Sequence, residues 1–303
     1  MKSRSPGQLA QIACLLEVTA RKPGNIHRFA DFSDSNYLDF LLSASAVAGP
    51  LDRVRELGVG RSVLEAVKST RQVVSTNTNL GMILLMAPLA AVPEPIDWPA
   101  GLDEVLSCLT MEDAREVYRA IRLAQPGGLG VVAEQDVAGE PTVPLLEAMR
   151  MAADRDLVAR QYAGRFAEVF DIALPTLRAS LVAGRPLETA IISTHLKLIS
   201  GCLDTLIVRK CGADIAAEAS RRAAEVLSAG WPDASPDPLP SFDTWLRADG
   251  HARNPGATAD LVAAALFVAL REGTILLPSP ANPAWWAPIE ESIPWPIPGT
   301  PCE

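Results

Sequence analysis

Apolar residues recur at helical spacing along most of the chain. The pattern predicts helices over about 6–20, 36–48, 60–74, 79–91, 101–107, 111–124, 142–153, 156–183, 186–203, 211–229, 240–249 and 256–272. We find no strand-like alternation, no βαβ rhythm and no repeat of fixed period. Pro175 should kink or split the long helix that contains it. The sequence predicts an all-α fold, with one globular multi-helix domain over 1–273 and a proline-rich irregular tail over 274–303.

The segment 253–260 leads into the most apolar stretch of the pattern. Asn254 is a good N-cap, Pro255 suits the first helical position, and Gly256 leaves the backbone accessible. The ten residues after Asp260 are apolar on almost every face, so we expect a buried helix. Asp260 would then lie in the first turn, beside free N–H groups. Such a start is either an ordinary capped core helix or a site for an anion or a metal–phosphate group.

Composition narrows the class of protein. Hydrophobic residues make up 49% and aromatic residues 5%, so the core must be built largely from Ala, Leu and Val, which suits close-packed helices. The net charge of -9 argues against a general nucleic-acid binder. The five cysteines form no CxxC pair, so we expect a reduced, cytoplasmic protein. No membrane contact is expected, because the most apolar run, 82–92, is too short to span a bilayer.

Three polar loops, 21–36, 125–141 and 230–239, interrupt the predicted helices. In the first, a turn at Gly24 is surrounded by the cationic or potentially cationic side chains of Arg21, Lys22, His27 and Arg28. In an acidic protein such a cluster could cradle an anion. The alternative is a solvated turn with scattered charges.

Five small polar residues, 75–79, stand before the apolar stretch 82–91 of a predicted helix. One helix start needs fewer caps than this run provides. Asn77 or Asn79 can cap the helix, and the other side chains, Thr78 among them, could bind a ligand through hydroxyl or amide groups. The alternative is an extended capping loop.

The loop 125–141 combines glycines with acids. Its glycines permit close approach to a ligand, but the sequence lacks the ending of a Walker loop and follows no strand. Glu134, Asp136 and Glu140 supply oxygen ligands of the kind that Mg²⁺ takes. A solvated acidic loop is the alternative.

Asp204 follows the apolar helix predicted over 186–203 and could be a buried carboxylate. Arg209 and Lys210 could pair with it or contact phosphate. His195, in the middle of the same helix, is interpreted as a core residue. Together, the acids, the basic clusters and the helix starts favour a metal-assisted site for a polyphosphate ligand. A Ser/His/Asp hydrolase is excluded because no nucleophile elbow is present.

Four motifs resemble, in order and rough spacing, those of the triphosphoribosyl-dephospho-CoA synthase family. They are Lys22-Pro23-Gly24, Asn77-Thr78, Asp204-Thr205 and the block from Pro255 to Leu261, and the resemblance covers about residues 8–272. It implies an all-helical transferase that joins the ribose C1 of ATP to the 2′-hydroxyl of dephospho-CoA and releases adenine. The product would be a prosthetic-group precursor for an acyl carrier protein.

The chain departs from the better-known family pattern at several positions. Asn79 and Leu80 stand where the family commonly has His-Lys, and Leu206 stands where it has Asn. The sequence looks more like a divergent branch found beside tetrahydromethanopterin-dependent one-carbon metabolism. One alternative is therefore the same transfer onto a ribitol-bearing tetrahydromethanopterin precursor. Another is a helical nucleotide-binding protein without catalysis.

The resemblance leads us to assign roles to the candidate residues. Asp204 and Asp260 are the catalytic candidates, and Mg²⁺–phosphate binding is assigned to Glu134, Asp136, Asp204 and Asp260. Phosphate neutralisation is assigned to Arg21, Lys22, Arg28, Arg209 and Arg253. Sugar or base contacts are assigned to Asn77, Thr78 and Asn79, and further ligand contacts to Gly24, His27, Asn254 and Gly256. The expected small-molecule partners are ATP with Mg²⁺ and dephospho-CoA or a related hydroxyl acceptor. A homodimer is a further alternative, in which a second copy of the chain is the partner.

Overall fold

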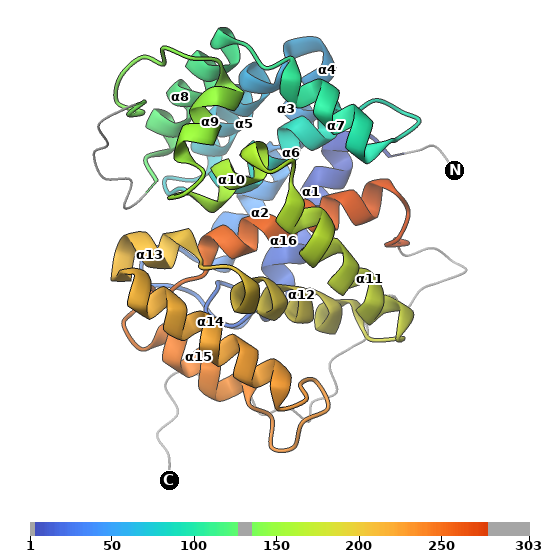
Figure 1. Ribbon diagram of the computed structural model, residues 1–303, viewed down its shortest axis with the longest axis vertical. Coiled ribbons are helices and arrows are strands. Elements are labelled where there is room, and N and C mark those ends of the chain that lie inside the picture. Colours follow the sequence, from blue (N-terminus) through green and yellow to red (C-terminus); the bar gives the residue numbers. More distant parts are fainter. Residues whose placement is uncertain (1–3, 127–134, 278–303) are drawn as a thin grey trace.

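Helices form nearly all the regular structure of the computed structural model, which describes residues 4–126 and 135–277 (Figure 1). The first half contains α1 (Pro6–Thr19), α2 (Tyr37–Ala46), α3 (Ala48–Asp52), α4 (Val54–Leu57), α5 (Val59–Val73), α6 (Leu80–Ala91), α7 (Trp98–Ser107) and α8 (Met111–Ala124). The second half contains α9 (Leu145–Ala152), α10 (Leu157–Ala163), the π-helix η1 (Glu168–Ala173), α11 (Leu174–Val182), α12 (Leu187–Gly201), α13 (Thr205–Cys211), α14 (Ala213–Ser228), α15 (Leu239–Arg247) and α16 (Gly256–Arg271). In these described parts, extended pairing is limited to one isolated bridge, so the all-α prediction is confirmed.

Helix α16 runs through the middle of the molecule, between the group around α3–α9 and the group α12–α15 (Figure 1). Every residue from Leu261 to Leu270 is buried, which confirms the expectation from its apolar faces. The larger hydrophobic core joins α16 to α1, α5, α6 and α8, while a smaller core lies among α12–α15. The alanines of α16 allow neighbouring helices to pack closely against this central helix.

The long helix predicted over 156–183 is broken, but Pro175 does not make the main break. Arg165 and Phe166 have φ of 55° and 61°, and this left-handed backbone ends α10. Phe166 is fully buried and its ring lies 5.8 Å from that of Tyr162, and this packing compensates for the unfavourable backbone. Pro175 lies just after the π-helical turn, which carries the local change in winding that an internal proline requires.

The start of α16 differs from the prediction. The helix begins at Gly256, its N-cap position is Pro255, and Asn254 does not cap it. Instead, Asp204 accepts a 2.7 Å hydrogen bond from the backbone N–H of Thr258. Asp260 lies beyond the first turn, so the predicted first-turn position of this acid is wrong.

Helix α13 was missed as a separate element, because the predicted helix at this point spans 211–229. Asp204 caps α13 by accepting hydrogen bonds from the N–H groups of Leu206 and Ile207, at 2.9 and 3.1 Å. Within the described ranges no single helix is long and apolar enough to cross a membrane; α12 and α13 satisfy that test only together, across a 58° bend. Of the predicted tail, residues 278–303 lie outside the described part of the chain.

Candidate functional site

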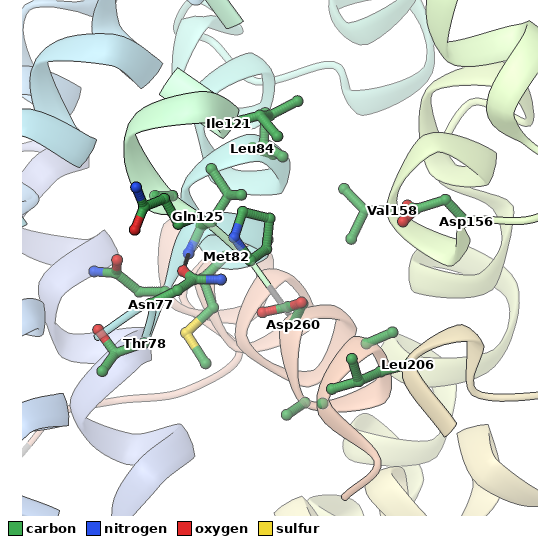
Figure 2. Close-up of a pocket in the computed structure, with 18 of the residues that line it drawn as sticks. Asn77, Thr78, Met82, Leu84, Ile121, Gln125, Asp156, Val158, Leu206 and Asp260 are labelled. Carbon is green, nitrogen blue, oxygen red and sulfur yellow. Dashed lines mark hydrogen bonds between the residues drawn. The ribbon is translucent and has the colours of Figure 1, made fainter. Parts of the chain in front are cut away.

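A cavity of about 670 Å³ lies between α6, α8, α9 and α10 on one side and the first turns of α13 and α16 on the other. This volume is in the range of pockets that hold nucleotide-sized ligands. Leu84, Ile121 and Val158 give one part of the wall an apolar surface, while Asn77, Asp156 and Asp260 are polar groups on the wall (Figure 2). A ligand with both an apolar portion and polar or charged groups would match this lining.

Asp260 projects from α16 into the space next to Met82, as Figure 2 shows. Its side chain is half-buried, and among the described residues no donor lies within hydrogen-bond distance of its carboxylate. Burial raises the pKa of this carboxyl well above the usual 3.8, and the nearby charge of Glu17 raises it further. A carboxylate with a raised pKa and no partner is suited to accept a proton from a ligand.

Glu17 reaches the cavity wall from α1 and is paired behind it. Its Oε1 lies 2.8 Å from Nζ of Lys22, and both side chains are buried. Burial raises the pKa of Glu17, and the Lys22 charge opposes that rise. Lys22 therefore balances a buried acid and does not line the cavity, and its role in binding phosphate remains a prediction.

The cavity is lined by the guanidinium and ammonium side chains of Arg71, Arg155, Arg209 and Lys210. Nη1 of Arg209 donates to Asp156 at 2.7 Å, while its Nε is buried without a hydrogen-bond partner in the described structure. Asp156 also caps α10 by accepting from the N–H of Ala159 at 2.9 Å. This cationic edge fits the anionic part of a ligand, and for Arg209 it agrees with the predicted location.

The polar run before α6 borders the cavity, with most of its side chains engaged in the fold. Oδ1 of Asn77 accepts from the N–H of Leu80 at 3.2 Å, as a helix cap would. Asn79 donates to the Ser43 carbonyl oxygen at 3.3 Å, and the Thr78 and Ser43 hydroxyls are 2.5 Å apart. Thr78 and Asn79 therefore hold the loop in place. Asn77 uses only its amide oxygen as a cap, so its amide NH₂ can donate to a ligand.

Two loops meet beside the cavity. Nε2 of His251 lies 3.2 Å from Oδ2 of Asp34, and the His251 ring stacks on Phe32 with centroids 4.8 Å apart. Nearby, Nδ2 of Asn25 donates to Oδ1 of Asn254 at 2.5 Å. Asn254 and Gly256 line the cavity as predicted, although Asn254 does so as a partner of Asn25.

Asp204 does not line the cavity. Its two oxygens accept four hydrogen bonds, two from α13 and two from the N–H and hydroxyl of Thr258 at 2.7 and 2.8 Å. Burial raises the pKa of this carboxyl, and those hydrogen bonds lower it. The side chain joins the starts of two helices, a position that does not support its predicted catalytic and metal-binding roles.

The predicted anion cradle of the first loop is engaged elsewhere in the fold. Arg21 and Arg28 both contact Glu188, at 3.3 and 3.2 Å. Gly24 donates to Asp243 at 2.7 Å. Burial, followed by the charge of Arg247, lowers the pKa of His27 to about 2, so this ring is neutral at physiological pH. The cavity is not lined by Arg21, Gly24, His27 or Arg28, and their ligand contacts remain predictions.

Arg253 also points away from the cavity. Its guanidinium lies 4.5 Å from the centre of the Trp245 ring, donates to the Trp245 carbonyl oxygen at 3.0 Å and pairs with Asp249. The guanidinium charge of Arg253 thus interacts with a neighbouring aromatic ring and a carboxylate. The predicted phosphate contact of Arg253 is therefore not supported.

Of the predicted metal ligands, Asp136 and Asp260 lie on the cavity wall, and Glu134 lies outside the described residues. The described ranges contain no group of three His, Cys, Asp or Glu side chains placed to hold a metal ion. Mg²⁺ bound with a polyphosphate needs only one or two carboxylates, since phosphate oxygens and water complete its shell. Asp136 on the wall fits that requirement.

Sequence reasoning missed Glu17, Arg71, Arg155 and Asp156 on the cavity wall. Glu17 had a detectable signal, because it is an acid inside the apolar run 12–18 of a predicted helix. Asp156 had another, because it precedes a helix at the capping position. Arg71 and Arg155 had none, since arginines near helix ends are common on surfaces.

Comparison with known proteins places the chain in a family. A family model described as ATP:dephospho-CoA triphosphoribosyl transferase matches residues 3–277. The chain belongs to this family. The family consists of transferases for which ATP is a substrate, so this chain is a transferase by family.

A solved structure supports the family assignment. It is a crystal structure from Archaeoglobus fulgidus of a protein provisionally described as a triphosphoribosyl-dephospho-CoA synthase. The two chains are 25% identical with a TM-score of 0.59, over 77% of this chain and 99% of that one. No curated protein matches the chain. The shared fold extends over almost the whole family relative, so the resemblance inferred from four short motifs is confirmed.

Proposed function

We propose that this protein transfers the triphosphoribosyl group of ATP to a hydroxyl of dephospho-CoA and releases adenine. The observation that carries the proposal is Asp260, a half-buried carboxylate without a partner among the described residues, on the wall of a ligand-sized cavity. The family match supports ATP as the donor and group transfer as the reaction class, and the cavity supports the location of the site.

The chemistry assigned to the site breaks one bond and forms one. The bond between ribose C1 and adenine N9 breaks, and its electron pair goes to adenine. The acceptor oxygen bonds to C1 and its proton passes to the carboxylate of Asp260, which returns a proton to the departing adenine. Positive charge develops on the sugar, and the negative charges of Glu17, Asp156 and Asp260 favour it there.

Binding of the triphosphate is assigned to Arg209, Lys210 and Arg155 on the cavity wall. Arg209 has a buried Nε that lacks a partner in the described structure, which a phosphate oxygen would satisfy. Mg²⁺ bound with ATP would neutralise phosphate charge, and we assign its protein ligand to Asp136. Asn77 is assigned to the sugar or the base through its amide.

The test is to incubate the purified protein with ATP, Mg²⁺ and dephospho-CoA and to measure adenine and the product mass. We expect adenine together with a product heavier than dephospho-CoA by one triphosphoribosyl unit. Adenine that appears only with a ribitol-bearing pterin precursor would retain the transfer and replace the acceptor. ATP binding without adenine release for any acceptor would contradict catalysis.

A further inference from the structure

Gly81 lies in the first turn of α6, where this helix meets α16 beside the cavity. A Cβ atom added to Gly81 would lie 2.0 Å from Oδ2 of Asp260, 2.4 Å from its Cγ and 2.9 Å from its Oδ1. Non-bonded atoms do not approach so closely. A side chain at position 81 and the carboxylate in its present place therefore exclude each other.

Gly60 is a close glycine of another kind, because it serves the packing of two backbones. A Cβ at Gly60 would lie 2.4 Å from Cα of Asp113 and 2.6 Å from its carbonyl oxygen. This glycine lets α5 approach the main chain of α8. Gly81 is different, because its three nearest contacts are all atoms of one carboxylate on the cavity wall.

We propose that Gly81 is a positioning residue: the missing side chain leaves a notch that holds the Asp260 carboxylate at the face of the cavity. The part of this inference that concerns the reaction rests on the proposed function. Hydrogen-bond donors usually orient a functional carboxylate. The described residues supply no donor to Asp260, so the notch at Gly81 orients its carboxylate instead. With Ala at position 81, rotation about the side-chain bonds of Asp260 would turn the carboxylate away while the fold persists.

The first test compares Gly81→Ala with Gly49→Ala. Gly49 lies in α3 with no atom within 4 Å of its added Cβ, so it provides the same substitution in open space. We expect kcat for adenine release to fall at least tenfold in Gly81→Ala, with KM for ATP changed less than twofold. Gly49→Ala should keep the unsubstituted values. A wild-type kcat in Gly81→Ala would overturn the proposal.

The second test probes the contact between position 81 and Asp260 without measuring activity. It compares the thermal unfolding of Gly81→Ala in two backgrounds, wild type and Asp260→Ala. We expect the substitution to lower Tm in the wild-type background and to raise it in the Asp260→Ala background, because there the collision is gone and Ala favours the helix. Gly60→Ala should lower Tm equally in both backgrounds. Equal loss for Gly81→Ala in both backgrounds would overturn the proposal. If the unsubstituted protein releases no adenine, the proposed function fails and this cycle alone decides the role of Gly81.

Discussion

At the scale of single residues, the acids at and near the cavity differ in whether they have hydrogen-bond or ion-pair partners. Asp204 accepts four hydrogen bonds and Glu17 pairs with Lys22, whereas the described residues provide neither kind of contact for Asp260. Buried charges normally have partners, because an unpaired one lowers stability. An exception on a cavity wall therefore indicates a functional group.

Asp260→Asn should stabilise the protein at neutral pH. The pKa of Asp260 is raised in the folded state by burial and by Glu17, Asp204 and Asp156, against the opposing charge of Arg209. The associated stability is full below the unfolded pKa of about 4 and is lost as the pH rises through the folded pKa. Asn does not ionise, so we expect a higher Tm than wild type at about pH 8 and no difference at about pH 3. A lower Tm at both pH values would contradict this account.

Lys22→Met should destabilise the protein, because it leaves Glu17 buried without its cation. Breaking such a buried pair costs roughly 3–5 kcal/mol, and urea unfolding would measure it. Adding Glu17→Gln should restore most of the loss. Arg53→Ala is the surface control, since Arg53 and Glu56 are exposed and such pairs contribute about 0–1 kcal/mol. Similar losses for Lys22→Met and Arg53→Ala would show that the buried pair is not important.

At the scale of elements, the helices of the core were predictable and their connections were not. The prediction over 60–74 corresponds to α5 and that over 111–124 to α8, because one face of each helix is apolar and buried. The cap of α16 comes from Asp204, 54 residues before Thr258. Arg21 is paired with Glu188, 167 residues away. Local pattern shows where a charge stands in the sequence, but only the folded chain shows what neutralises it.

Asp204→Ala should cost roughly 2–4 kcal/mol in the free energy of unfolding, because it leaves the starts of α13 and α16 without their shared acceptor. Asp204→Asn keeps one carbonyl oxygen in place and should cost less. Chemical denaturation measures both variants. Unchanged stability with lost turnover would return Asp204 to the catalytic role that the sequence suggested.

Lys210→Ala tests the cationic edge that α13 brings to the cavity. Lys210 is exposed on the cavity wall, so its removal should raise KM for ATP by roughly tenfold, about 1.4 kcal/mol, and leave kcat nearly unchanged. The increase should shrink at high salt, because salt screens exposed charges. Lys197→Ala is the matched control, since Lys197 is exposed and does not line the cavity. Equal effects of the two substitutions would contradict the assignment.

At the scale of the whole molecule, the buried helix α16 connects the large core to the candidate site. Its apolar length packs against α1 and α6, and its first two turns present Gly256 and Asp260 to the cavity. The cavity itself lies between elements distant in sequence, so no local motif contained it. Two of the motifs that carry the family resemblance nevertheless contribute to its wall, through Asn77 and Asp260.

The most direct measurement is adenine released per protein molecule from ATP, Mg²⁺ and dephospho-CoA, comparing wild type, Asp260→Asn and Asp204→Asn. The two variants make the same isosteric change to two acids that are neighbours in space, one on the cavity wall and one engaged in helix capping. We expect wild type and folded Asp204→Asn to release adenine, and Asp260→Asn to be slower by about 10²–10⁴-fold, as for loss of a general base. Wild-type release by Asp260→Asn, or no release by wild type with any hydroxyl acceptor, would contradict the account.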